Sequence, residues 1–130
     1  MRKFFEAAAD RFAEATFTSG AAAAMFLIGT LYGAGELSQI NMWGPRWWRH
    51  HVSDFGFPAV FSFYMVLVCR TRHAPALTAG YAFFLTCEVL QNFGSGPPGF
   101  DWTDIFSASL STLLITILIR REETERLRTP

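Results

Sequence analysis

The charged residues of this 130-residue chain gather in five segments, and the stretches between them are almost wholly apolar. Asp, Glu, Lys and Arg make up 17% of the residues, whereas a soluble domain usually carries about 25%. Charged side chains need water and apolar side chains tolerate lipid, so this alternation is typical of helices that cross a membrane and end in water. The charged segments are residues 2–14, 36–54, 70–72, 88–104 and 120–128.

Four apolar stretches are candidates for membrane spans, each of which needs roughly 17–25 mostly apolar residues. Two of the stretches are short, so local thinning of the bilayer or interfacial aromatic residues would have to help them cross. The sequence therefore predicts an all-α fold, a four-transmembrane-helix bundle forming one membrane domain over residues 1–130. Small residues, notably Gly29-x-x-x-Gly33, would let the helices pack closely. The predicted spans cover about residues 17–39, 54–69, 75–93 and 104–119.

The positions of Arg and Lys predict the orientation of the bundle, since loops rich in these residues stay in the cytoplasm. Nine of the 11 basic residues precede the first span, join the second to the third, or follow the fourth. Only Arg46 and Arg49 lie on the other side. We therefore expect a multi-pass protein of the plasma (inner) membrane with both termini cytoplasmic and residues 120–130 as a cytoplasmic tail.

Residues 3–15 precede the first apolar stretch and are predicted to form a short amphipathic helix on the inner membrane surface. A secretory signal peptide is the competing interpretation, with Gly33-Ala34-Gly35 resembling a cleavage site, but acidic residues ahead of the apolar run argue against it. The apolar face of the helix would consist of Phe4, Phe5, Ala8 and Phe12.

Acidic residues of the predicted spans all fall in the half of the bundle away from the termini. Ionisable groups within spans are costly, and they usually face the bundle interior or a watery cavity. If each polar stripe faces inward, four carboxylates, two amides and, in one alternative, a His converge in a cup that opens outward. Glu88 and Asp104 are the candidate catalytic residues in this cup. The candidate binding residues are Gln91, Asp54, Glu36 and Gln39.

Structural roles compete with this interpretation at several positions. Asp54 and Asp104 both precede apolar runs and could be helix N-caps. His50 and His51 flank Arg49 in a Trp-rich segment and are expected to be interfacial residues rather than ligands. Glu88 has no capping role and no basic residue near it in sequence, so a functional role explains it best.

The sequence assigns no metal ligands and no cofactor. Glu, Asp and His can bind divalent metals, but no His-x-x-x-His or Glu-x-x-His spacing is present. No His lies in the middle of a span, which disfavours a haem or chlorophyll at membrane depth. The formal net charge is zero, so nothing indicates a nucleic-acid partner held through phosphate contacts.

Two segments 52 residues apart share a pattern, since Glu36-Leu-Ser-Gln39 precedes Gly44-Pro45 and Glu88-Val-Leu-Gln91 precedes Gly96-Pro97. The two segments would end spans that point the same way, as in a parallel repeat of a two-helix unit. Transporters often contain such repeats, with the binding site between them. A small transporter is therefore one functional alternative. Convergence of two membrane boundaries without duplication is the competing explanation of the repeated pattern.

The segment from Glu88 to Phe106 resembles the signature of the VanZ-like membrane family, which has a helix ending in Glu-x-x-Gln, a short Gly/Pro turn and an Asp opening the last helix. The resemblance implies that Glu88, Gln91 and Asp104 are shared polar positions, and Asp54 could match an acidic residue at the start of an earlier helix. The chain departs from the family at Ala108, where an Asn is frequent.

Two functions follow from these features. The first is a membrane protein that binds or acts on an envelope component, such as a lipid headgroup, a lipid-linked sugar or a glycopeptide, at the outward carboxylate cup. Whether it is an enzyme stays open. The second is a non-catalytic accessory subunit of a larger membrane complex, with aromatic spans buried against a partner or pigments. Membrane lipids, such a complex or a homo-oligomer are the expected partners.

Overall fold

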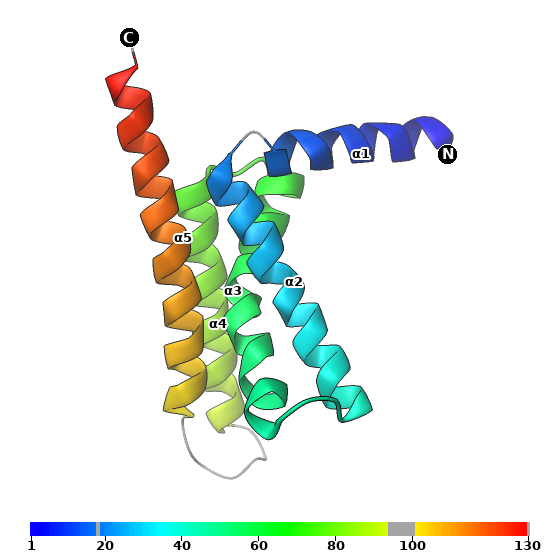
Figure 1. Cartoon of the computed structure of the whole chain (residues 1–130), viewed down its shortest axis with the longest axis vertical. Helices are drawn as coiled ribbons and strands as arrows, with labels where there is room; N and C mark the ends of the chain where they lie inside the picture. Colours follow the sequence, from blue (N-terminus) through cyan, green and yellow to red (C-terminus); the bar gives the residue numbers. More distant parts are fainter. Residues whose placement is uncertain (18, 94–100, 130) are drawn as a thin grey trace.

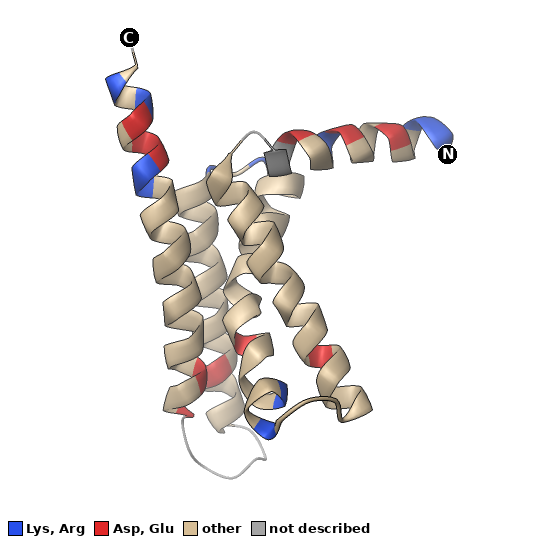
Figure 2. Cartoon of the chain, in the orientation of Figure 1, with Lys and Arg blue, Asp and Glu red and all other residues tan. Residues whose placement is uncertain are grey.

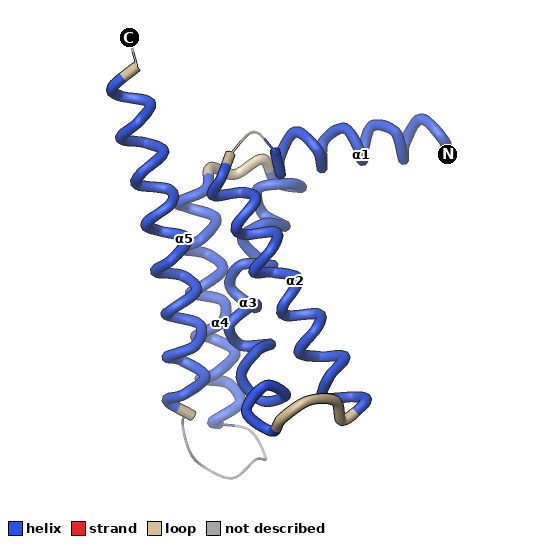
Figure 3. The backbone as a smooth tube through the Cα atoms, in the orientation of Figure 1, coloured by secondary structure: helices blue, strands red, loops and turns tan. Residues whose placement is uncertain are grey.

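The computed structural model describes residues 1–17, 19–93 and 101–129, and this part of the chain is helical, without strands (Figure 3). The all-α prediction is confirmed. Five helices follow one another along the chain (Figure 1): α1 (Arg2–Phe17), α2 (Gly20–Asn41), α3 (Arg46–Cys69), α4 (His73–Phe93) and α5 (Trp102–Arg128).

Helices α2 to α5 run side by side with alternating directions, while α1 projects sideways from the bundle (Figure 1). Both termini lie toward the same end of the bundle, which we call the terminal end. The opposite end, where α2 is joined to α3 and where α5 begins, is called the far end. Helix α3 is central, because it packs against each of the other four helices.

Three helices, α2, α3 and α5, are long and apolar enough to cross a membrane, which indicates a membrane protein. The prediction of four such helices is wrong for α4. That helix begins at His73 and carries Glu88, Gln91 and Asn92 near its other end, and these polar residues dilute its apolar character. Within the described residues, the bundle therefore has three candidate spans and a fourth helix packed against α3 and α5.

Two helices extend beyond the predicted boundaries. Helix α3 begins at Arg46 instead of about residue 54, because Pro45 occupies the N-cap with a backbone φ of −65° that suits a helix start. Helix α5 continues through the segment expected to be a tail, where Arg121 Nε lies 2.9 Å from Glu125 Oε1. Such ion pairs one turn apart support a helix in water.

The aromatic side chain of Phe12 packs the first helix against the bundle. The Phe12 ring meets Phe26 and Phe63 edge-on, with centroids 5.0 Å and 5.8 Å away. Phe4 and Phe5, which were predicted on the same apolar face, are exposed. Helix α1 therefore contributes Phe12 to the edge of the core, whereas residues 1–11 are exposed.

Glycines set the distance between α2 and α3, but not in the predicted pattern. A Cβ on Gly56 would overlap the backbone nitrogen of Tyr32, and one on Gly35 would lie 2.5 Å from the backbone nitrogen of Ser53. A Cβ on Gly29 would lie 3.0 Å from the Cα of Val60, whereas one on Gly33 would meet nothing within 4 Å. The predicted Gly29-x-x-x-Gly33 motif is therefore half right, because only Gly29 faces the neighbouring helix.

Candidate functional site

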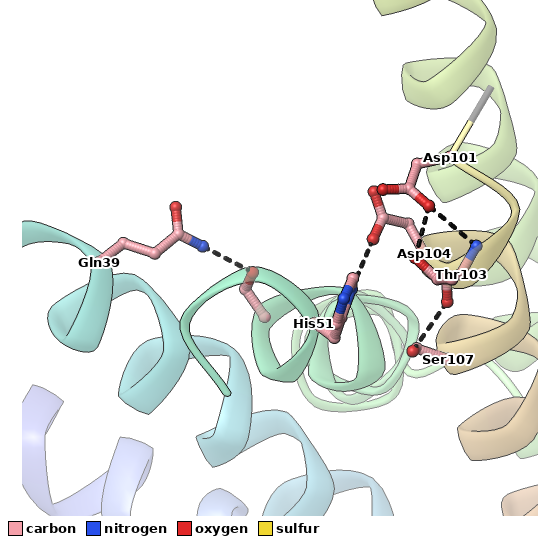
Figure 4. Close-up of polar contacts among 7 residues, drawn as sticks. Gln39, His51, Asp101, Thr103, Asp104 and Ser107 are labelled. Carbon is pink, nitrogen blue, oxygen red and sulfur yellow. Dashed lines mark hydrogen bonds and ion pairs between the residues drawn. The ribbon is translucent and has the colours of Figure 1, made fainter. Parts of the chain in front are cut away.

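Asp and Glu occur at both ends of the bundle, whereas Lys and Arg are concentrated at the terminal end (Figure 2). At the far end, His51 and Asp54 of α3 approach Asp104 of α5. His51 Nδ1 lies 2.9 Å from Asp104 Oδ1 (Figure 4). One ligand-capable atom of each of the three side chains lies within 4.8 Å of the other two. We call His51, Asp54 and Asp104 the His-Asp cluster.

The start of α5 orients Asp104 toward α3. Asp101 is the N-cap, and its side chain accepts hydrogen bonds from the hydroxyl and the backbone N–H of Thr103 (Figure 4). These two bonds hold the pKa of the Asp101 carboxyl below its usual range. Because the Asp101 side chain caps the first turn of α5, the Asp104 side chain is free to contact His51.

The alternative in which Asp54 and Asp104 are N-caps is wrong for both residues. Asp54 lies inside α3, whose N-cap is Pro45, and Asp104 lies in the first turn of α5 after its N-cap. Pro58, four residues after Asp54, has no N–H to donate to the Asp54 carbonyl in the helix ladder. Neither carboxylate is therefore the N-cap of its helix.

Glu88 lies near the His-Asp cluster, on a third helix. This side chain is half-buried on α4, and it is close enough to interact electrostatically with Asp54, Asp101 and Asp104. Gln91, one turn further along α4, is exposed. The structure therefore brings together both candidate catalytic residues and one of the candidate binding residues.

The two predicted residues of α2 lie apart from the His-Asp cluster. Gln39 is exposed and donates from its amide to the hydroxyl of Ser53, 3.2 Å away. Figure 4 shows this contact on the side of α3 opposite to the His51–Asp104 pair. Glu36 is half-buried and interacts with Tyr32 of its own helix. The predicted cup of four carboxylates and two amides therefore includes neither Glu36 nor Gln39.

A cavity of about 660 Å³ opens beside the cluster. Its walls include cationic and anionic side chains, an indole ring and two imidazole rings. A second cavity, of about 470 Å³, lies next to it and shares Arg46 and His50. The residues that line the larger cavity are Arg46, Trp47, His50, His51, Asp101 and Asp104.

Asp54, Glu88 and Asp104 have no Lys or Arg ion-pair partner in the described part of the chain, residues 1–17, 19–93 and 101–129. Asp104 pairs with His51, whose side chain is 32% exposed while that of Asp104 is 20% exposed, and Asp104 also interacts with Asp54. A half-buried group of acids with one imidazole can accept hydrogen bonds from hydroxyls, hold a proton or bind a cation.

Sequence reasoning missed His51 as a site residue and missed Arg46 and Trp47 as cavity residues. The signal for His51 was its spacing from Asp54, since residues three apart share one face of a helix. This spacing did not indicate a shared face, because residues 46–53 were predicted to lie outside a helix.

Comparison of the chain with protein-family models, with curated proteins and with solved structures found no match. The resemblance to the VanZ-like family therefore stays a prediction. Its Gly/Pro turn, like the second Gly-Pro of the 52-residue repeat, lies outside the described residues.

Proposed function

We propose that this protein is an integral membrane protein that binds the polar headgroup of an envelope component in the cavity beside the His-Asp cluster. The observation that carries the proposal is the convergence of His51, Asp54 and Asp104 beside a cavity that also contains Arg46. Headgroups of lipids and of lipid-linked sugars combine hydroxyl groups with phosphates. The cavity offers acceptors for the first and a guanidinium donor for the second.

Each group has a role in this proposal. Arg46 donates paired hydrogen bonds to a phosphate, as guanidinium groups commonly do. Asp104, which lines the cavity, accepts from hydroxyls together with the neighbouring Asp54. Trp47, whose side chain is largely exposed, is suited to anchor at the membrane interface. Glu88 and Asp104 are the groups that would accept a proton from a bound hydroxyl if the protein catalyses a reaction.

The site faces outward in this proposal, and both termini face the cytoplasm of the inner membrane. Basic residues concentrate at the terminal end (Figure 2), which is the arrangement that keeps that end cytoplasmic. Alkaline phosphatase fused after Trp43 should be active, because the enzyme requires the periplasm, and a fusion after Arg128 should be inactive. The reverse pattern would contradict the orientation.

Native mass spectrometry of the detergent-purified protein tests the headgroup proposal. We expect the wild-type chain to retain phosphate-bearing lipids from the membrane, and Arg46→Gln and Asp104→Asn to lose most of these adducts. Asp10→Asn and Arg120→Gln change the same charges away from the cavity and should retain them. Equal adducts in all five proteins would show that the lipids bind elsewhere.

An accessory subunit of a larger complex is the second candidate. The observation in its favour is the exposure of several tryptophans at the far end, with Trp43 65% and Trp102 73% exposed. Gentle solubilisation followed by size separation distinguishes the candidates. A chain that migrates only within a larger complex, and that carries no lipid of its own, favours the subunit.

A further inference from the structure

The His-Asp cluster has the composition of a metal centre. Two of its side chains come from α3, where His51 and Asp54 are three residues apart and share a face, and the third comes from the first turn of α5. An imidazole with two carboxylates is a donor set that zinc and manganese accept. We propose that His51, Asp54 and Asp104 bind one divalent cation, Zn²⁺ or Mn²⁺, at the far end of the bundle.

The distances agree with such a centre. Ligand bonds of about 2.0–2.2 Å place neighbouring ligand atoms of a tetrahedral ion about 3.3–3.6 Å apart. The three candidate ligand atoms lie within 4.8 Å of one another, and His51 Nδ1 lies 2.9 Å from Asp104 Oδ1. Small rotations of the Asp54 and Asp104 side chains bring all three into range.

The charge balance supplies an independent reason for a cation. Asp54 and Asp104 are close to each other and to Glu88, and the described part of the chain offers these acids no Lys or Arg at ion-pair distance. Half-buried carboxylates in one place repel one another unless they share a proton or a positive group lies between them. A divalent ion provides that group.

The cavity gives the ion open coordination positions. It borders His51 and Asp104 and contains Arg46 on its wall. Three protein ligands with the remaining positions open are typical of metal centres that bind a substrate or water. This inference rests on the proposed function, since the ion would hold one oxygen of the headgroup whose phosphate Arg46 binds. The imidazole ligand argues for Zn²⁺ or Mn²⁺ over Ca²⁺ or Mg²⁺, which prefer oxygen ligands.

Metal binding can be measured directly on the full chain in detergent. After treatment with EDTA, equilibrium dialysis against Zn²⁺ or Mn²⁺ should load one ion per chain, with little uptake of Ca²⁺. His51→Gln, Asp54→Asn and Asp104→Asn should each weaken binding by about tenfold or more. His73→Gln and Asp10→Asn are the matched controls and should bind as the wild type does.

Wild-type binding of no ion, or unchanged binding in the three ligand variants, would overturn the inference. A spectroscopic measurement avoids dependence on variants that fold poorly. Pulsed electron paramagnetic resonance of Mn²⁺ bound to the wild-type chain should show coupling to one nitrogen, and labelling of histidine with ¹⁵N should change that coupling. Bound Mn²⁺ without nitrogen coupling would exclude His51 as a ligand and overturn the inference.

Lipid retention separates this inference from the proposed function. If the chain binds no ion and still retains lipid through Arg46 and Asp104, the metal centre is refuted and the headgroup site stands. If the chain binds Mn²⁺ through His51 and retains no lipid, the metal centre stands and the headgroup site is refuted.

Discussion

Replacing Gly56 by Ala should separate α3 from α2 and destabilise the bundle. The added Cβ would overlap the backbone nitrogen of Tyr32 and would lie 2.9 Å from the carbonyl oxygen of Ile28. Carbon makes favourable contacts at about 3.5–4.0 Å, so α2 has to move by more than half an ångström. Both obstacles are backbone atoms, which cannot rotate away as a side chain would.

The magnitude follows from two opposing effects. Overpacking of a close contact costs about 1–3 kcal/mol, and the upper part of that range applies because whole helices have to shift. Alanine in place of glycine recovers up to about 1 kcal/mol of helix propensity. We therefore expect a net loss of about 2 kcal/mol in the free energy of unfolding.

Gly33 provides the matched control on α2. A Cβ there would meet nothing within 4 Å, so Gly33→Ala should be neutral or stabilise the protein by up to about 1 kcal/mol. Equilibrium unfolding of the purified proteins in mixed micelles with increasing sodium dodecyl sulfate, followed by circular dichroism, measures both. The reasoning about helix contact is refuted if Gly56→Ala proves as stable as Gly33→Ala.

Three further predictions concern how the helices are attached to one another. Glu122→Ala removes the acceptor of two hydrogen bonds from the N-terminal turn of α2, at 2.9 and 3.0 Å, and should lower the free energy of unfolding by about 1–3 kcal/mol in the same titration. Glu123→Ala is the control and should cost less than about 0.5 kcal/mol. Equal losses would contradict the role of Glu122 in capping α2. Phe12→Ala should release α1 and speed its cleavage by trypsin, whereas Phe5→Ala, an exposed position, should not, and unchanged cleavage in both would refute the anchor. Tyr81→Phe loses a 2.6 Å hydrogen bond between α4 and α5 and should cost about 0.5–1.5 kcal/mol, so a neutral change would show that water replaces it.

The helices were predictable because apolar stretches between charged segments have few other ways to satisfy their backbone in lipid. Their ends were less predictable. Residues 46–53 are rich in Trp, Arg and His, which indicated a loop, yet a helix that leaves the membrane has no need of apolar residues. The charged segment at the C-terminus is helical for the same reason, stabilised in water by pairs such as Arg121 with Glu125.

The sequence could predict only those site residues whose burial is energetically costly. Asp54, Glu88 and Asp104 were found because acids near apolar runs need a reason to be there. Glu36 and Gln39 were included on the assumption that every polar stripe faces the same centre. The pattern along one helix shows which residues share a face, but it does not show how that helix is rotated against its neighbours.

That rotation also decides which residues of α3 matter. Gly56 and Asp54 are two residues apart, so they project to different sides of the helix, one toward α2 and the other toward Asp104 of α5. The close contact at Gly56 fixes the rotation of α3, and this rotation turns His51 and Asp54 toward the start of α5. A cation held by these side chains and Asp104 would in turn stabilise the contact between α3 and α5, because a ligand that binds only the folded arrangement favours it. Helix packing and the proposed ligand binding at the far end would therefore both follow from one geometry.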